Sequence, residues 1–364
     1  MTIASNTKLV SENDLKTFCV AVLKKVDVPE NDAREIIDNL VEADLRDVES
    51  HGIVRLPIYA ERLAARATNP QPNIKIVRET ATTAVVDGDN GMGQIVGARA
   101  MQIAIDKAKA NDACVFVSVR NSNHYGAAAF YAEMACPHDM IGFSFTIGGI
   151  NHMVPWGGAQ ARLGNNPFAV AFPAGKERPV VLDMACSVAA RGKIIVAAKE
   201  GTPIPADWAV GPDGQPTTDA VEALKGFVQP IGGPKGYSLT LVIGLLSTML
   251  SGANFGSEVT HMYDDLERPQ NVGHLMGVLP VALFEDVDVF HRRMEKAVSE
   301  MRSAKRAPGV ERIFLPGERE ALNLINRREN GIPIGVGVLA ELNELGARHG
   351  LHLAAMDSHE KTTA

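Results

Sequence analysis

The segment Gly91-Met-Gly-Gln-Ile-Val-Gly97 divides the possible folds of this chain into two classes. An apolar strand over 83–86 precedes it and a helical pattern over 94–110 follows it, as around a dinucleotide-binding loop. The next strand, 113–119, ends in Arg120-Asn121 and lacks the acidic residue that would bind a ribose. The glycine spacing is also one residue longer than the standard motif. The pattern therefore leaves two interpretations open: a dinucleotide-binding loop, and a glycine-rich turn that starts a helix.

The segments around this loop show helical and strand patterns in turn. Residues 11–49 predict two helices, with Ser11 or Asn13 as the cap of the first and Pro29 near the start of the second. Residues 74–77 and 83–86 alternate in polarity and predict a strand pair. The most apolar run, Leu239 to Leu250, is too short to cross a bilayer and predicts a buried helix. Further strands are expected at 141–145, 168–172, 180–182 and 273–284.

Composition limits the class of protein. The 364 residues are 46% hydrophobic and 22% charged, as in a soluble globular protein, and the length suggests two domains. A net charge of −7 argues against nucleic-acid binding, and the N-terminus lacks the layout of a signal peptide. The cysteines stand singly in apolar contexts, so we expect buried free thiols and a cytoplasmic location. No Cys or His spacing typical of a metal site occurs, and no metal is predicted.

His51, Arg55 and Tyr59 follow one another at a spacing of four residues. On a helix this spacing places them on one face, where Arg55 could bind a carboxylate and Tyr59 could add a donor, with His51 beside the reacting atoms. Gly52 and Pro57 complicate this prediction, because either can end, start or kink a helix. The alternative interpretation is an exposed helix end with scattered polar residues.

His124 follows a predicted strand and opens a predicted helix that runs to about Met134. The positive end of a helix dipole favours the neutral imidazole, which is the form that can accept a proton from a hydroxy acid. A plain capping role for His124 remains the alternative.

Three further segments carry candidate ligand-binding groups. The loop 146–158 is rich in glycine, and long loops of this kind inside compact domains are usually functional. Its polar side chains are Asn151 and His152, although His152 fits a solvated loop residue equally well. Asp183, at a strand end, could accept a hydrogen bond from a ribose hydroxyl. Lys235 follows two glycines at a helix start, where backbone N–H groups can bind phosphate.

Several short blocks resemble one known family, the type-2 malate/L-lactate dehydrogenases. They occur in family order between about Glu42 and Pro333, and the wording is most similar to the ureidoglycolate dehydrogenase branch through Met262-Tyr-Asp-Asp-Leu266 and Pro205-Ala-Asp-Trp-Ala-Val210. The branch carries a Ser-Asp pair where this chain has Gly148-Gly149. The blocks are Ser50-His-Gly52 with Arg55-Leu-Pro57 and Tyr59, Asn121-Ser-Asn-His-Tyr-Gly126, Leu182-Asp-Met-Ala-Cys-Ser187 with Arg191-Gly-Lys193, and Gly233-Pro-Lys-Gly-Tyr237.

The resemblance implies an α/β fold with a non-Rossmann cofactor domain, built on a large, mostly antiparallel mixed sheet. It favours the helix-starting turn at 91–97 over the dinucleotide loop. A helical domain for substrate binding and dimer formation is expected from both chain ends, 1–75 and 300–364, with the cofactor domain at 76–299. Family members are homodimers whose active site draws on both subunits, so we expect the same here.

The resemblance also implies roles for individual residues. His124 is the expected proton donor and acceptor, with His51 and Ser50 beside it. Expected substrate-binding residues are Arg55, Tyr59, Asn151 and His152. Expected cofactor-binding residues are Gly148, Asp183, Met184, Ala185, Lys235, Gly236, Glu318, Arg319 and Glu320.

The predicted activity is hydride transfer between a nicotinamide cofactor and a small 2-oxo acid or 2-hydroxy acid. NAD is expected rather than NADP, because Glu318 and Glu320 would repel a 2′-phosphate and Arg319 would pair with these acids; an inward-facing Arg319 would favour NADP instead. Reduction of cyclic imino acids is an alternative, and Lys193 argues against it because that branch prefers an acid there. A non-catalytic binding protein is the third interpretation.

Overall fold

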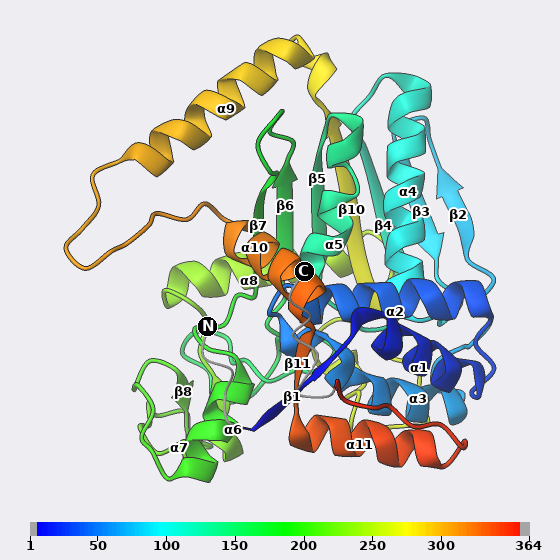
Figure 1. Cartoon of the computed structure of the whole chain (residues 1–364), viewed down its shortest axis with the longest axis vertical. Coiled ribbons are helices and arrows are strands. Elements are labelled where there is room, and N and C mark those ends of the chain that lie inside the picture. The colour runs from blue at the N-terminus through cyan, green and yellow to red at the C-terminus, as the bar shows by residue number, and fades with distance from the viewer. Residues whose placement is uncertain (1–5, 357–364) are drawn as a thin grey trace.

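Both ends of the chain contribute to one helical part. The structure, a computed structural model, describes residues 6–356. β1 pairs with β11 in a two-stranded antiparallel sheet, which joins the two ends, and the helices lie beside it (Figure 1). Ser11 caps α1 as expected, accepting a hydrogen bond from the backbone of Asp14. The elements are β1 (Thr7–Val10), α1 (Glu12–Lys24), α2 (Glu30–Leu45), α3 (Leu56–Ala64), β11 (Ile332–Gly335) and α11 (Val336–Ala347).

A seven-stranded mixed sheet forms the other part, in the order β2-β3-β4-β10-β5-β6-β7. Every neighbouring pair is antiparallel except β3 and β4, which run parallel. The predicted large, mostly antiparallel mixed sheet is therefore confirmed. The strands are β2 (Lys75–Glu79), β3 (Thr83–Asp87), β4 (Val115–Ser122), β5 (Met140–Thr146), β6 (Phe168–Phe172), β7 (Val180–Met184) and β10 (Val272–Pro280).

The glycines at 91–97 start helix α4 (Gly93–Asn111), which connects β3 to β4. This single parallel unit is flanked by antiparallel strands, so the sheet is not a Rossmann fold. A Cβ at Gly93 would lie 2.5 Å from the carbonyl oxygen of His124, and one at Gly97 would lie 2.8 Å from the ring of Tyr131. The glycines therefore let α4 pack closely on its neighbours. Of the two interpretations of this segment, the structure supports the glycine-rich turn that starts a helix.

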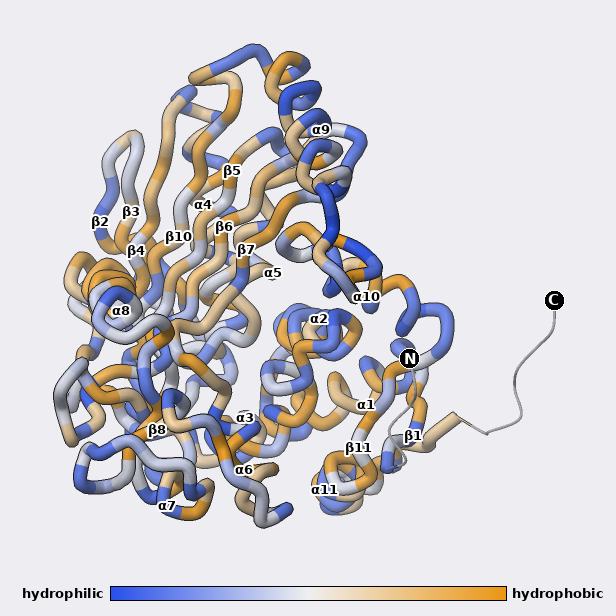
Figure 2. Tube along the Cα trace, turned by 90° about the vertical axis from the view of Figure 1, so that its left-hand side faces the viewer, coloured by the Kyte–Doolittle hydropathy of each residue, from blue (hydrophilic) through white to orange (hydrophobic). Residues whose placement is uncertain are grey.

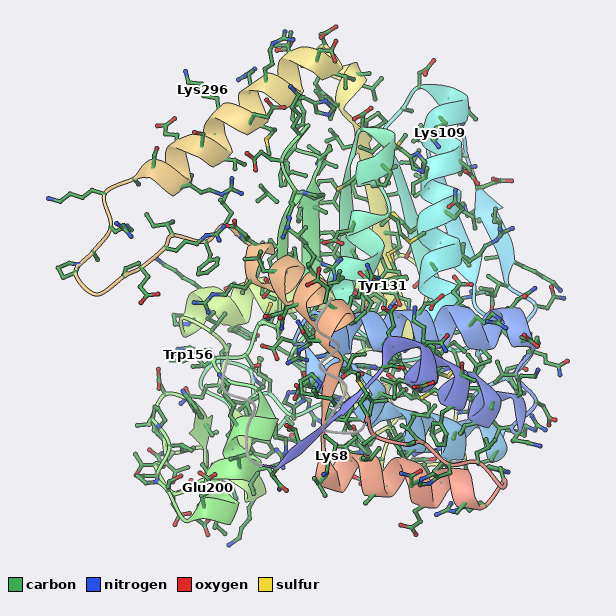
Figure 3. All side chains as sticks on the ribbon, in the orientation of Figure 1. Lys8, Lys109, Tyr131, Trp156, Glu200 and Lys296 are labelled. Atoms are coloured by element: carbon green, nitrogen blue, oxygen red, sulfur yellow. The ribbon has the colours of Figure 1, made fainter. Side chains whose placement is uncertain are left out.

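Helix α5 (Ala128–Glu133) packs on β5 and β6 and touches the helical part. Its Tyr131 receives a hydrogen bond from Asn39 of α2, and Figure 3 shows Tyr131 where the two helices meet. The contact links the sheet to α2, and the cavity described below lies beside it.

Helix α8 (Pro234–Thr248) contains most of the apolar run and corrects the prediction of a buried helix. It lies on the other side of the sheet from α5 (Figure 2). Apart from Ile243, its buried face consists of small and polar residues such as Gly244 and Ser247, which allow close approach to β10. Most of the large apolar side chains face outward: Leu239, Val242, Leu245 and Leu246 on the helix, and Met249 and Leu250 just after it, are all exposed. The helix was predicted correctly, but the prediction that its large apolar side chains are buried was wrong.

The remaining elements form a small lobe and an arm. The lobe has its own core around Ile194 and Ala209 and contains α6 (Arg191–Glu200), β8 (Ala209–Val210), α7 (Ala220–Lys225) and β9 (Phe227–Val228). The arm, which contains α9 (Val287–Ser303), stands away from the body in Figure 1, and Val298 is the one buried residue of this helix. The chain returns to α2 through α10 (Glu318–Asn330). No helix within 6–356 is long and apolar enough to span a membrane.

Candidate active site

The segment that carries His51 and Arg55 is not a continuous helix. It forms two 3-10 turns, Glu49–His51 and Ile53–Arg55, before α3 begins at Leu56. The expected single helix face is therefore wrong. Gly52 lies between the two turns, where a Cβ would overlap the carboxyl group of Asp44. This carboxyl group accepts a hydrogen bond from the backbone of Ile53 at 2.8 Å.

The turns nevertheless bring the expected side chains together. The rings of His51 and His124 stack with their centroids 5.6 Å apart. The hydroxyl of Tyr59, on α3, is hydrogen-bonded to Nδ1 of His124 at 2.6 Å. Ser50 Oγ lies 2.9 Å from Nδ1 of His51. Ser50, His51, Tyr59 and His124 thus form one connected group from segments far apart in sequence.

His124 is held in its neutral form by a cause other than the expected one. α5 begins only at Ala128, so His124 lies before the helix and outside its first turn. Burial lowers the pKa of His124 well below its usual 6.5, and the nearby Arg55, His51 and His274 lower it further. Burial and Arg55 also lower the pKa of His51 to about 4. Both imidazoles are therefore neutral at physiological pH.

Arg55 is oriented for anion binding. Its Nε donates to the backbone oxygen of Ser50 at 2.7 Å, and within residues 6–356 no hydrogen bond engages its two terminal nitrogens. Those nitrogens form the fork that binds a carboxylate in a bidentate manner. A substrate acid held by Arg55 would lie beside His51 and His124.

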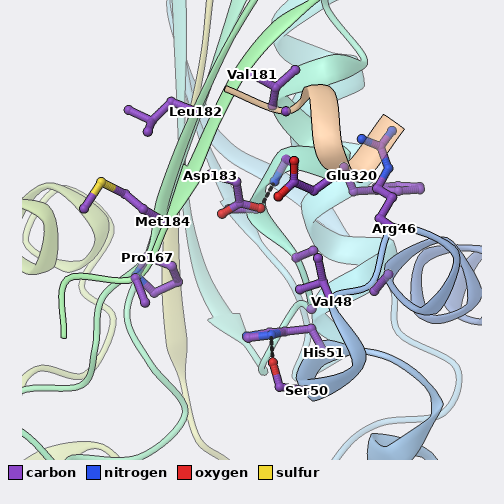
Figure 4. A pocket seen from close by; sticks show the side chains of 18 of the residues that line it. Arg46, Val48, Ser50, His51, Pro167, Val181, Leu182, Asp183, Met184 and Glu320 are labelled. Carbon is purple, nitrogen blue, oxygen red and sulfur yellow. Dashed lines mark hydrogen bonds between the residues drawn. The ribbon is translucent and has the colours of Figure 1, made fainter. Parts of the chain in front are cut away.

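A cavity of about 410 Å³ opens from Ser50 and His51. It runs between α2 and α5 to strand β7 and to Glu320 on α10 (Figure 4). Small residues leave the space open, among them Gly126, Ala127, Ala128, Ala185 and Ala190. Asp183, Met184 and Ala185 all line it, as does Glu320.

The charged groups of the cavity are mainly acidic. Asp183 accepts from the backbone of Ala129 at 2.8 Å, and burial raises the pKa of its carboxyl to about 6, so it is largely ionised at neutral pH. Glu42 and Glu320 also line the cavity. Arg46 is the cation among the lining residues, and it is already paired with Glu42 and Glu133. The cavity therefore favours hydroxyl donors over a phosphate at this end.

The sequence and structure are similar to known dehydrogenases. The family model for malate/L-lactate dehydrogenase matches residues 10–343. The chain belongs to this family. A malate dehydrogenase of Pyrococcus abyssi is 39% identical over 96% of this chain and 97% of its own length. A ureidoglycolate dehydrogenase of Escherichia coli O157:H7 is 34% identical over 87% of this chain and 88% of its own. The solved sulfolactate dehydrogenase of Methanocaldococcus jannaschii superposes with a TM-score of 0.89 at 40% identity, covering 95% of this chain and 98% of that one.

In this member of the family, several residues with predicted roles are not among the residues that line the cavity. Arg55, Tyr59 and His124 reach it only through their neighbours Ser50 and His51. Asn151 donates to the backbone of Gly256, and the ring of His152 contacts the backbone of Ile150 at 3.3 Å. A Cβ at Gly148 would lie 2.7 Å from Oδ1 of Asn165, so this glycine lets two loops pass closely. Lys235 and Gly236 lie at the start of α8 and are not among the lining residues.

The acids near Arg319 are arranged differently from the expectation. Glu318 is buried and pairs with Arg302 and Arg312, and the guanidinium of Arg319 lies 4.9 Å from the centroid of the Phe314 ring. Within 6–356 no ion pair joins Arg319 to its acidic neighbours, so the expected pairing is wrong. Of these three residues only Glu320 lines the cavity.

Sequence reasoning missed the contribution of α2. Asn39, Glu42 and Arg46 line the cavity from one face of this helix. Their spacing of three and four residues, within a helix whose other inward positions are apolar, was the signal that could have identified them. Within the described part of the chain, no cluster of three or more His, Cys, Asp or Glu residues is suited to a metal.

Proposed function

We propose that this family member is an NAD-dependent dehydrogenase of small 2-hydroxy acids. The observation that carries the proposal is the contact of Tyr59 with His124 and of His124 with His51, beside the free fork of Arg55. A proton-transfer group next to a carboxylate-binding group is what interconversion of a 2-hydroxy acid and a 2-oxo acid requires.

In this mechanism Arg55 binds the substrate carboxylate. A bound nicotinamide supplies or accepts the hydride. His124 exchanges the proton of the substrate oxygen through Nε2, because Tyr59 occupies Nδ1. His51 stacks against His124 and excludes water from one side of its ring, while Ser50 fixes the orientation of His51.

NAD is proposed over NADP on the charge of the cavity. A 2′-phosphate adds about −2 charge at neutral pH and would meet Asp183 and Glu320, while Arg46 is already paired with Glu42 and Glu133. Carboxylates can instead accept hydrogen bonds from free ribose hydroxyls. Met184 and Ala185 lie along the same wall and would contact the cofactor. The residues present therefore fit NAD.

For the substrate we propose malate or a similar acid. The malate and sulfolactate dehydrogenases described above are 39% and 40% identical to this chain, against 34% for the ureidoglycolate enzyme. This chain has Gly148-Gly149 in place of the Ser-Asp pair of the ureidoglycolate branch, which also favours a malate-like substrate over ureidoglycolate.

We further propose a homodimer. The apolar outer face of α8 is unusually large for a helix in contact with solvent, and a second copy of this chain would cover it. The open position of Ser50 leaves room for side chains of a partner near the site.

The test is a screen of reductase activity with NADH and NADPH against oxaloacetate, pyruvate, sulfopyruvate and a cyclic imine. We expect an oxo acid with NADH to give the highest kcat/KM, and His124→Ala to lower kcat by about two to four orders of magnitude. A cyclic imine as best substrate would contradict the oxo-acid assignment. A kcat/KM at least about tenfold higher with NADPH would contradict the choice of NAD.

A further inference from the structure

Gln94 is a buried polar residue behind the proposed proton-transfer group. It is the second residue of α4 and only 1% exposed. Its Nε2 donates to the hydroxyl oxygen of Tyr59 at 3.4 Å. Its Oε1 is buried and has no partner among the described residues. Gln94, Tyr59 and His124 therefore form a chain of hydrogen bonds that ends at Nδ1 of the imidazole.

The orientation of the Gln94 amide sets the direction of this chain. With Nε2 toward Tyr59, one carbonyl oxygen remains unpaired. The flipped amide would present Oε1 to Tyr59 in place of this N–H donor and would lose the hydrogen bond that Nε2 makes. The amide therefore donates, and the oxygen of Tyr59 accepts.

The proton of Tyr59 then has one destination. Burial raises the pKa of Tyr59 to about 12, so its hydroxyl is neutral and carries a single proton. Because its oxygen already accepts from Gln94, this proton points to Nδ1 of His124, 2.6 Å away. A neutral imidazole that accepts at Nδ1 carries its own proton on Nε2.

We propose that Gln94 is a positioning residue that acts through Tyr59 to hold His124 as the Nε2–H tautomer. The inference rests on the proposed function. It means that the resting enzyme carries the His124 proton on Nε2, ready for reduction of a 2-oxo acid. Hydride reaches the carbonyl carbon, the Nε2 proton of His124 moves to the carbonyl oxygen, and the Tyr59 proton moves to Nδ1. Gln94 stabilises the resulting phenolate until Nε2 of His124 takes up a proton from solvent and the Nδ1 proton returns to Tyr59.

The direct test is the tautomer itself, read from ¹⁵N–¹H correlation spectra of protein labelled at histidine. His124 resonances are assigned by their loss in His124→Gln. We expect an Nε2–H pattern in the wild type and a mixture of both tautomers in Gln94→Met. An Nδ1–H pattern in the wild type, or an unchanged pattern in Gln94→Met, would overturn the inference.

Kinetics separate positioning from packing. Gln94→Met should lower kcat for reduction about fivefold, the worth of one neutral hydrogen bond, with KM nearly unchanged. In a Tyr59→Phe background the same change should have no further effect, and an equal loss there would show a packing role and refute the inference. The matched control is Gln102→Met on the same helix, where the side chain donates to Asp106 and has no role at the site, so no effect is expected. If the wild type reduces no oxo acid, the proposed function fails, while the spectra still test the role of Gln94.

Discussion

At the scale of single residues, Asp44 links the stability of the protein to pH. Burial raises the pKa of Asp44 to about 8, against an ordinary value of 3.8, while the carboxyl holds the turn that presents Arg55. The folded state thus keeps a proton that the unfolded state loses, so this group makes the free energy of unfolding fall as pH rises from about 4 to about 8, by at most ~1.4 kcal/mol per pH unit.

Asp44→Asn keeps an acceptor for Ile53 but cannot ionise. We expect this variant to match the wild type near pH 4.5 and to be more stable at pH 7.5, measured by urea unfolding at fixed protein concentration across that range. Parallel curves for the two proteins would mean that Asp44 is ionised in the fold.

Residue identity was more predictable than residue environment. His124, Arg55 and Tyr59 could be selected from chemistry and motif, and the structure brings them together. The cause of the low pKa of His124 could not be predicted, because burial and the approach of Arg55 depend on packing between distant segments. Gln94 escaped notice for the same reason, since its partner Tyr59 is 35 residues away in sequence.

At the scale of elements, the start of α4 controls the position of His124. Gly93→Ala would place a methyl group 2.5 Å from the carbonyl oxygen of His124, and backbone atoms must move to relieve the contact. We expect a loss of ~1–3 kcal/mol in the free energy of unfolding, as for other overpacked sites, together with a lower kcat.

The control for this substitution is Gly337→Ala in α11, where an added Cβ meets no atom within 4 Å. It should leave kcat unchanged and be neutral or stabilise by up to about 1 kcal/mol. Equal effects of the two substitutions would remove the argument from close packing at Gly93.

Helices and strands were predicted well where periodicity is strong, and less well where two causes compete. The strand pair at 74–86 and helices α1 and α2 follow their patterns. Between His51 and Arg55 the spacing of four residues predicted a helix, but the close packing of Gly52 on Asp44 produces two 3-10 turns instead. In α8 the apolar content was clear, but periodicity alone does not say which face of an apolar helix meets the sheet.

At the scale of the whole molecule, the sheet order came from family resemblance and not from residue patterns. β10 lies between β4 and β5, although more than a hundred residues separate β5 from β10 in sequence. No local pattern encodes such a pairing, because strand order depends on long-range packing. The domain boundaries at 75 and 300 stay a prediction.

The proposed homodimer can be tested by a substitution on the exposed apolar face of α8. Val242 is 51% exposed on its apolar outer face, and Val221 on α7 is 52% exposed in the small lobe. Val242→Glu and Val221→Glu thus introduce the same change at equally exposed helical sites. In a two-fold dimer formed through α8, each interface would contain the new charge twice, at a desolvation cost that few interfaces tolerate.

We expect Val242→Glu to be monomeric and Val221→Glu dimeric, measured by light scattering on a sizing column, with both variants folded by circular dichroism. If both subunits contribute to each active site, as the family resemblance predicts, the monomeric variant should also lose most of its activity. A dimeric Val242→Glu protein would exclude α8 as the contact surface, and a monomeric wild type would exclude the homodimer.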